Sequence, residues 1–277
     1  MSADPYREFR LAVGRPEEEI DLARAALAMV SCDYPHLDVD AYLARIDELA
    51  GAAKLCLGSE SDVYGSIAAL NGVLFQQRGF HGNRENYFDP KNSFLNEVLD
   101  RKIGIPISLS VLYIEVAQRV GLPLHGVGFP GHFLVKYSGD SEEILIDPFN
   151  QGEIRSHESL ESTLDKLYGR RISLNPDFLE STATKQILRR MLNNLKITYL
   201  RVNDLMRGLS VVERLVILDP ASGVDIRDRG ILYFKLECFK QALEDLENYL
   251  RLAPHAEDAD AVRHQVALLE KQVAQLH

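Results

Sequence analysis

The sequence has few cysteines, and they lie far apart from one another. Cys32, Cys56 and Cys238 are scattered through 277 residues, without any C-x-x-C pattern. Disulfide frameworks and structural zinc sites both need cysteines at short, repeated spacings. The sequence therefore argues against both kinds of site and is typical of a reducing compartment.

Long hydrophobic runs and an excess of positive charge are also missing. No window approaches the ~18 apolar residues of a membrane span, and Met1 to Arg15 lacks the apolar core of a signal peptide. Asp and Glu number 41 against 31 Lys and Arg, which gives a formal charge of -10 and leaves no evident basic patch for nucleic acid. We expect a cytoplasmic protein with neither a membrane nor a nucleic-acid partner.

Histidines are present, but their spacing is not that of a metal site. His81, His125 and His132 are the candidate ligands together with Asp147, yet the sequence has no His-Glu-x-x-His and no local pair of ligands on one helix or turn. We therefore predict no metal and no other cofactor.

The clearest structural pattern runs from Arg101 to Asn150. A turn at Gly104 and Pro106 precedes the nearly all-apolar stretch Ile107 to Val120, and Gly121 to Pro123 then ends the helix. A helix that is apolar all round is buried, so we expect this one to pack against a sheet.

Two strands are predicted after this helix. Gly126 to Tyr137 and Glu142 to Asp147 flank a turn centred on Gly139-Asp140. That turn sets His132 directly opposite Asp147, with Cβ atoms about 4.5 to 5.5 Å apart. A carboxylate at this distance can fix the tautomer of an imidazole, but a buried histidine satisfied by an aspartate for packing explains the pair equally well.

The remaining segments are predicted to be mainly helical. Asp219-Pro220 and Ala253-Pro254 are 34 residues apart, the period of the tetratricopeptide repeat, and a final helix resembles a capping helix. The segment Tyr6 to Val13 fits a strand or an irregular arm. We predict an α+β domain with N-terminal helices and a small antiparallel sheet over residues 1-170, followed by an all-α tetratricopeptide-like region over 180-277.

Several short motifs resemble those of a known family. Gly104-Ile-Pro-Ile-Ser108, Ala117-Gln-Arg119-Val-Gly121-Leu-Pro123, Gly131-His132 and Ile146-Asp147-Pro148 resemble the core of the transglutaminase-like, papain-like superfamily. Leu70-Asn71, Gly79-Phe-His-Gly-Asn83, Asp89-Pro90, Pro106-Ile-Ser-Leu-Ser110 and Phe129-Pro-Gly-His-Phe133 are similar to the SirB-one family of bacterial proteins. The resemblance covers Ala50 to Asn150 and implies a papain-like core.

The resemblance also implies where a catalytic site would lie. In the superfamily a cysteine opens the central helix, a histidine lies on the next strand and an aspartate on the strand after. His132 and Asp147 match the last two, whereas Ser108 stands where the cysteine is expected. A thiol beside an imidazole ionises near neutral pH, but a serine needs a base and oxyanion donors during the attack.

Two functions follow from this departure. One is a non-catalytic or weakly active protein that binds a protein or peptide partner. The other is a Ser108-His132-Asp147 hydrolase or acyltransferase that acts on an amide or ester bond. Asn83, Tyr87 and Ser110 are the candidate substrate-binding residues, although a series of tight turns is the better explanation of the loop that holds Asn83 and Tyr87. The sequence leaves the oligomeric state open.

Overall fold

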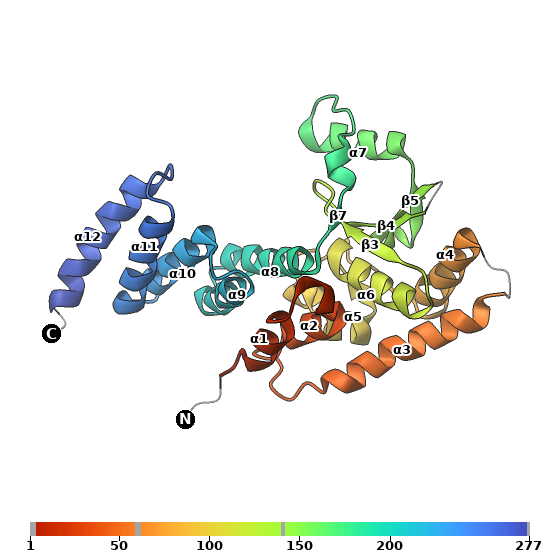
Figure 1. Cartoon of the computed structure of the whole chain (residues 1–277), viewed down its shortest axis with the longest axis horizontal. Helices are drawn as coiled ribbons and strands as arrows, with labels where there is room; N and C mark the ends of the chain where they lie inside the picture. Colours follow the sequence, from red (N-terminus) through yellow and green to blue (C-terminus); the bar gives the residue numbers. More distant parts are fainter. Residues whose placement is uncertain (1–3, 59–61, 140–141, 276–277) are drawn as a thin grey trace. The chain divides into compact units, whose positions relative to one another are not determined.

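The chain folds into two compact units. The computed structural model describes residues 4–58, 62–139 and 142–275, and its units are Met1–Met191 and Leu192–His277 (Figure 1). The first unit extends beyond the predicted limit at residue 170, because β7 (Ser181–Thr182) pairs with β3 (Leu124–Val127) of the sheet. Helix α8 (Thr184–Arg201) begins in the first unit and ends in the second.

Helices form most of the first unit. They are α1 (Arg7–Val13), α2 (Leu22–Ala28), α3 (Val39–Cys56), α4 (Val63–Asn71), a π-helical turn (Gly72–Gln77), α5 (Leu95–Arg101), α6 (Pro106–Arg119) and α7 (His157–Tyr168). Aspartates cap the starts of α2, α3 and α4 through Asp21, Asp38 and Asp62, as expected for a short acceptor at this position. The expectation of a strand or irregular arm at Tyr6 to Val13 was wrong, because α1 buries Phe9 and Val13 on one helical face.

A small antiparallel sheet forms the other layer of this unit. Its strands are β3, β4 (Leu134–Ser138), β5 (Glu143–Asp147), β6 (Glu153–Arg155) and β7, in the order β6-β5-β4-β3-β7 within the described ranges. A separate parallel pair joins β1 (His81–Gly82) to β2 (Ile103–Gly104).

The register of the hairpin differs from the prediction. Ile146 pairs with Val135, whereas the predicted turn pairs it with Phe133. Asp140 of that turn, and Ser141 after it, lie outside the described residues. The difference is two positions, and side chains alternate with period two, so His132 and Asp147 keep the same relation to the faces of the sheet. His132 therefore lies before β4 instead of opposite Asp147 within the ladder.

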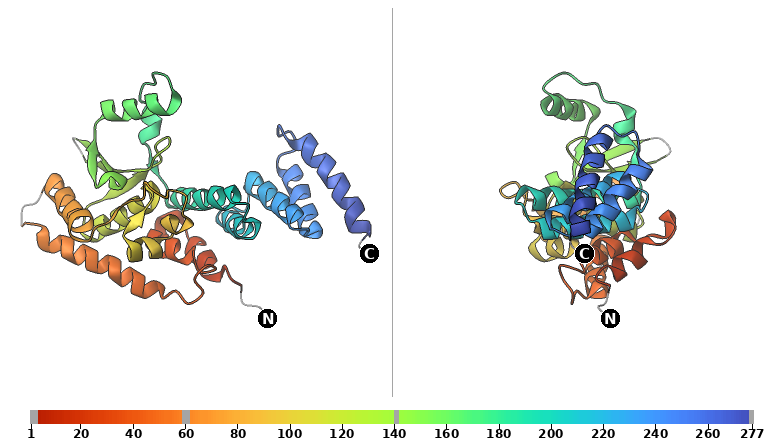
Figure 2. Two further views of the ribbon diagram at one scale, coloured as in Figure 1. Left: turned by 180° about the vertical axis from the view of Figure 1, so that it is seen from behind. Right: turned by 90° about the vertical axis from the view of Figure 1, so that its left-hand side faces the viewer.

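Helix α6 is the buried centre of the unit, as predicted. Every residue from Pro106 to Ala117 is buried. The helix contacts β3 and β4 on one side and α3 on the other, so it lies between the sheet and the N-terminal helices (Figures 1 and 2). Helix α7 covers the opposite side of the sheet, where Leu160 and Leu164 pack with Val127, Leu134 and Leu145.

The second unit is helical. After the end of α8 it contains α9 (Leu205–Leu218), α10 (Gly223–Lys235), α11 (Phe239–Leu252) and α12 (Ala259–Gln275). Each helix packs on the next one in sequence. A Cβ added at Gly230 would lie 2.9 Å from Leu246, so a residue without a side chain lets α10 and α11 approach closely. Among the described residues, none of the helices has the length and apolar character to cross a membrane.

Candidate functional site

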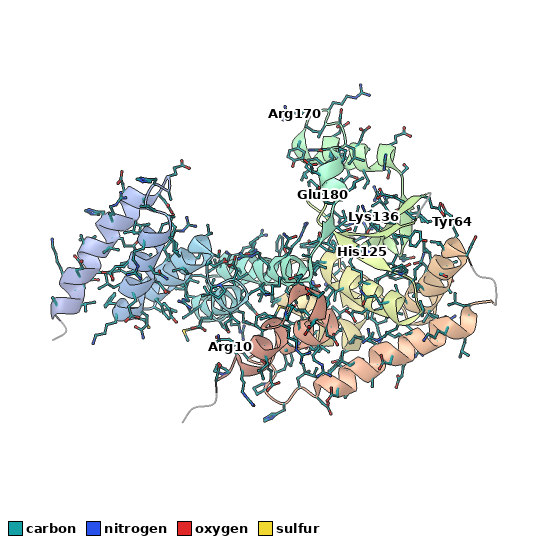
Figure 3. The ribbon with its side chains drawn as sticks, in the orientation of Figure 1. Arg10, Tyr64, His125, Lys136, Arg170 and Glu180 are labelled. Atoms are coloured by element: carbon teal, nitrogen blue, oxygen red, sulfur yellow. The ribbon has the colours of Figure 1, made fainter. Side chains whose placement is uncertain are left out.

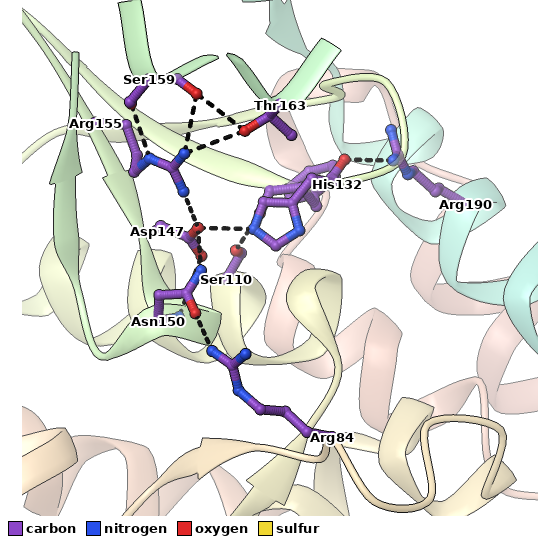
Figure 4. A network of polar contacts seen from close by, with 10 residues as sticks. Arg84, Ser110, His132, Asp147, Asn150, Arg155, Ser159, Thr163 and Arg190 are labelled. Carbon is purple, nitrogen blue, oxygen red and sulfur yellow. Dashed lines mark hydrogen bonds and ion pairs between the residues drawn. The ribbon is translucent and has the colours of Figure 1, made fainter. Parts of the chain in front are cut away.

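The structure brings His132 and Asp147 together. His132 precedes β4, Asp147 is the last residue of β5, and Nε2 of the imidazole lies 2.9 Å from Oδ2 of the carboxylate (Figure 4). Asp147 is fully buried, whereas the His132 side chain keeps 17% exposure. Among the described residues Nε2 has no partner that meets hydrogen-bond geometry, so the 2.9 Å approach to Oδ2 is a close polar contact, which is an ion pair when the imidazole is protonated. Nδ1 is then the ring nitrogen left for a ligand.

Asp147 is held by two further side chains. Asn150 donates its amide Nδ2 to Oδ2 at 2.7 Å and its backbone N–H to Oδ1 at 3.2 Å, and Arg155 approaches Oδ2 at 3.2 Å. Burial by itself raises the pKa of the Asp147 carboxyl, but the contacts with His132 and Asn150 outweigh burial and lower it below its ordinary value. Asp147 is therefore a buried, ionised carboxylate.

Helix α7 fixes the position of Arg155. The guanidinium donates to the Ser159 hydroxyl at 3.1 Å, to the Ser159 carbonyl at 3.3 Å and to the Thr163 hydroxyl at 3.2 Å. These bonds satisfy the donors that do not face Asp147, as a buried charge requires. Arg155 thus ties the sheet, α7 and the His132–Asp147 pair into one network (Figure 4).

A second arginine orders the loop that carries His132. Arg190 of α8 donates to the Phe129 carbonyl at 3.0 Å and to the His132 carbonyl, and its guanidinium lies 5.3 Å from the centre of the Phe133 ring. Two carbonyls bound by one planar donor restrict the loop backbone. Arg190 therefore positions the imidazole through the main chain.

The loop after Asp147 depends on a close backbone approach. Asn71 donates to the Gly152 carbonyl at 3.0 Å and accepts a hydrogen bond from the Tyr113 hydroxyl at 3.0 Å. Gly152 has φ +75, and a Cβ there would lie 1.9 Å from the Asn71 side chain. Only glycine fits this position, so the motif asparagine at position 71 braces the segment that carries Asp147.

Ser108 does not join the pair. Its fully buried hydroxyl donates to the Asn92 carbonyl at 2.6 Å and accepts the Ile105 N–H at 3.0 Å. These bonds satisfy the N-terminus of α6, a role typical of serine at the start of a helix. Neither His132 nor Asp147 is among its hydrogen-bond partners in the described part of the chain. The role of Ser108 as a nucleophile stays a prediction, and in the structure its hydroxyl bonds main-chain groups at the start of α6.

Ser110 is the α6 serine on the side of the site. Positions two apart on a helix point about 200° apart, so Ser108 and Ser110 face different surroundings. Ser110 points toward the His132–Asp147 pair in Figure 4, and its buried hydroxyl donates to the Phe133 carbonyl at 3.4 Å. In the structure its proton therefore faces a carbonyl and not the imidazole.

The two other predicted binding residues lie in the loop before η3 (Pro90–Ser93). Asn83 donates to the Asn92 side chain at 3.1 Å and accepts the Asn86 N–H at 2.9 Å, as in a residue that builds turns. Tyr87 is 41% exposed, and its hydroxyl interacts electrostatically with Arg190. Tyr87 is thus available to a ligand, whereas the side chain of Asn83 is engaged in the loop.

Four polar residues of the site were not predicted from the sequence. They are Arg84, Asn150, Arg155 and Arg190. Asn150 follows Asp147 by three residues, the spacing of an aspartate cap, so a local signal for it exists. Arg190 comes from a distant helix, and no local pattern identifies it. In the described residues no group of three or more metal-ligating side chains forms.

Comparison with known proteins identifies both regions. A model of the transglutaminase-like superfamily matches residues 40–193, and a model of the tetratricopeptide repeat matches residues 195–267. A UPF0162 protein of Xylella fastidiosa is 36% identical, and the alignment covers 94% of each chain. A UPF0162 protein of Vibrio cholerae is 32% identical, and Protein SirB1 of Salmonella typhimurium 28% identical, each over 91% of this chain and 93% of its own. These matches confirm the resemblance and the predicted α+β core with tetratricopeptide-like helices.

Proposed function

The chain belongs to the transglutaminase-like superfamily, with the SirB1 and UPF0162 proteins as relatives, and from this premise we propose that it is a non-catalytic or weakly active member that binds a protein or peptide. One observation carries the proposal. The hydroxyl at the start of α6 that replaces the superfamily thiol is buried and bonded to the main chain of Asn92. The cysteines of the chain lie elsewhere, at Cys32, Cys56 and Cys238.

The binding role rests on both regions of the chain. Tetratricopeptide repeats in general mediate protein–protein interaction, and the matched region contains the end of α8, the helices α9, α10 and α11, and the first part of α12. In the first unit the His132–Asp147 pair keeps a partly exposed imidazole, and the exposed Tyr87 interacts electrostatically with Arg190, which binds the His132 carbonyl. A rigid polar pair together with an exposed aromatic side chain suits a surface that fixes the orientation of a bound chain.

A second candidate function is supported by the pair itself. An imidazole oriented by a buried carboxylate is the base of a hydrolase or acyltransferase on an amide or ester bond. In that reaction the Ser110 oxygen attacks the carbonyl carbon while Nδ1 of His132 takes the hydroxyl proton. The imidazolium then returns this proton to the leaving group, and water or another nucleophile releases the acyl group. Ser110 takes the nucleophilic role here because it points toward the pair and its bond to the Phe133 carbonyl is long, at 3.4 Å, whereas the Ser108 hydroxyl bonds the Asn92 carbonyl at 2.6 Å.

Two measurements on the full chain test the proposal. The first is labelling by a fluorophosphonate probe, which reacts with activated serines, on the unmodified protein and on Ser110→Ala, Ser108→Ala and His132→Ala. We expect no labelling above that of the His132→Ala protein. Stoichiometric labelling that disappears in Ser110→Ala and His132→Ala would establish the hydrolase instead.

The second measurement is selection from a random peptide library displayed on phage. We expect peptides to be enriched by the full chain over an unrelated protein of similar negative charge. If no peptide is enriched, the peptide-binding function is wrong.

A further inference from the structure

The surroundings of His132 are basic in a chain that is acidic as a whole. Arg84, Arg155 and Arg190 all belong to the polar network around the His132–Asp147 pair, whereas the formal charge of the chain is -10 (Figure 4). Among the described residues, only Arg155 of these three pairs with a carboxylate, that of Asp147. The network therefore holds more positive charge than its own acids compensate.

Arg84 is the arginine that is open to a ligand. Its exposed guanidinium donates one bond, through Nη2, to the Asn150 side-chain oxygen and lies 5.4 Å from the centre of the Phe149 ring. The same ring meets the imidazole of His132 edge-on, with centroids 6.0 Å apart. In the part of the chain that the structure describes, Nε and Nη1 of Arg84 have no hydrogen-bond partner.

Arg190 adds a second charge without a carboxylate partner. Its guanidinium binds carbonyl oxygens, which carry no net charge, and burial lowers its pKa although the Tyr87 hydroxyl partly offsets that effect. A pKa lowered by burial means that the charged form lacks full compensation. Tyr87 itself packs edge-on against Phe88, and both rings are exposed, at 41% and 46%.

The nearest acidic residues in sequence do not neutralise this charge. Glu85 follows Arg84, and Glu153 is the strand partner of Asp147. Both are exposed, and neither pairs with an arginine of the network within the described ranges. An exposed carboxylate is hydrated and screened, so it compensates a partly buried guanidinium only weakly.

We propose that the surface over His132 binds an acidic peptide, with the free donors of Arg84 contacting a peptide carboxylate. The inference rests on the proposed peptide-binding function and deepens it by naming the chemistry of the partner. A free N–H of the guanidinium can donate a charge-assisted hydrogen bond to a carboxylate, which is stronger than a bond between neutral groups. Nδ1 of His132 offers a further polar contact, and the exposed rings of Tyr87 and Phe88 suit an apolar residue beside the acidic one.

The test compares the composition of the selected peptides between charge variants. The phage library is selected against the unmodified full chain, Arg84→Glu and Arg170→Glu. Arg170, which follows α7 and is labelled in Figure 3, is a matched control because it is exposed, belongs to the same unit and makes none of the hydrogen bonds given above for the network. Circular dichroism and thermal unfolding confirm that the variants keep the fold, which is expected because both side chains are exposed.

We expect Asp and Glu to be enriched in the peptides selected by the unmodified chain and by the control variant Arg170→Glu. Arg84→Glu should lose this enrichment and bind a selected acidic peptide about tenfold or more weakly, the usual effect of a lost charge-assisted contact. Synthetic peptides with Glu replaced by Gln should show the same loss on the unmodified chain.

Three outcomes overturn the inference. If peptides are selected without acidic enrichment, or if Arg84→Glu keeps it, the ligand is not recognised by its carboxylate, while the peptide-binding function stands. If no peptide is selected by the unmodified chain, the peptide-binding function and this inference are both wrong.

Discussion

Replacing Asp147 with asparagine should destabilise the first unit strongly. The change keeps the shape of a side chain that is 0% exposed but removes the negative charge between Arg155 and His132. Removing one partner of a buried ion pair costs about 3 to 5 kcal/mol of unfolding free energy, because the other charge stays buried. Arg155 keeps its bonds to Ser159 and Thr163, so we expect the lower end, about 3 kcal/mol.

The strand partner of Asp147 provides the matched control. Glu153 lies opposite Asp147 in the β5–β6 pair, is exposed and makes no ion pair within the described residues. Glu153→Gln removes the same charge, so its effect should stay within about 0.5 kcal/mol. The chain has no tryptophan, so circular dichroism in urea is a suitable measurement. Hydrogen exchange of β4 and β5 then assigns the loss to the first unit.

The pH dependence gives a second check on the same reasoning. Burial raises the pKa of Asp147, but the contacts with His132 and Asn150 lower it by a larger amount. The pKa in the folded chain therefore lies below the unfolded value of about 3.9. A carboxyl with a lowered folded pKa stabilises fully above its unfolded pKa and loses that contribution as the pH falls through the folded pKa. The difference between the unmodified chain and Asp147→Asn should therefore shrink below about pH 4. If Asp147→Asn and Glu153→Gln are equally stable at pH 7, the buried network does not stabilise the unit as argued.

Two further substitutions test other parts of the chain. Ser108→Ala should lower the free energy of unfolding by about 1 to 3 kcal/mol, because it leaves the Asn92 carbonyl and the Ile105 N–H without their hydrogen-bond partner. Peptide selection should stay unchanged, and altered selection would place Ser108 in the binding site. Gly230→Ala should lower the free energy of unfolding of the second unit by about 1 to 3 kcal/mol, because the added Cβ would lie 2.9 Å from Leu246. Unfolding in urea measures this loss. Gly223→Ala is the control, since its Cβ would have only ordinary contacts, and an equal loss there would refute the close-packing argument.

Local patterns in the sequence predicted much of the fold. The apolar run from Ile107 to Val120 predicted the buried helix α6, and the Gly-Leu-Pro break predicted its end. The 34-residue spacing of Asp219-Pro220 and Ala253-Pro254 predicted the repeat helices. These signals are local because helix periodicity and turn chemistry depend on neighbouring residues.

The predicted meeting of His132 and Asp147 rested on an incorrect register. The turn was misplaced, yet an error of two positions preserves the face on which each side chain lies. The sequence also left open which serine of α6 faces the pair. Which face of α6 lies toward His132 depends on how the helix packs between the sheet and α3, and the sequence of a uniformly apolar helix does not encode that rotation.

By itself the sequence determined that the chain has an α+β core, a histidine and an aspartate on consecutive segments, no thiol at the start of the central helix, and a helical repeat region. Only the tertiary structure decided that Ser110 and not Ser108 lies on the side of the site, and that Arg84, Arg155 and Arg190 surround the pair. The physical reason is range: periodicity and capping act between neighbours, whereas a buried charge network is assembled from segments whose proximity exists only after the chain has packed.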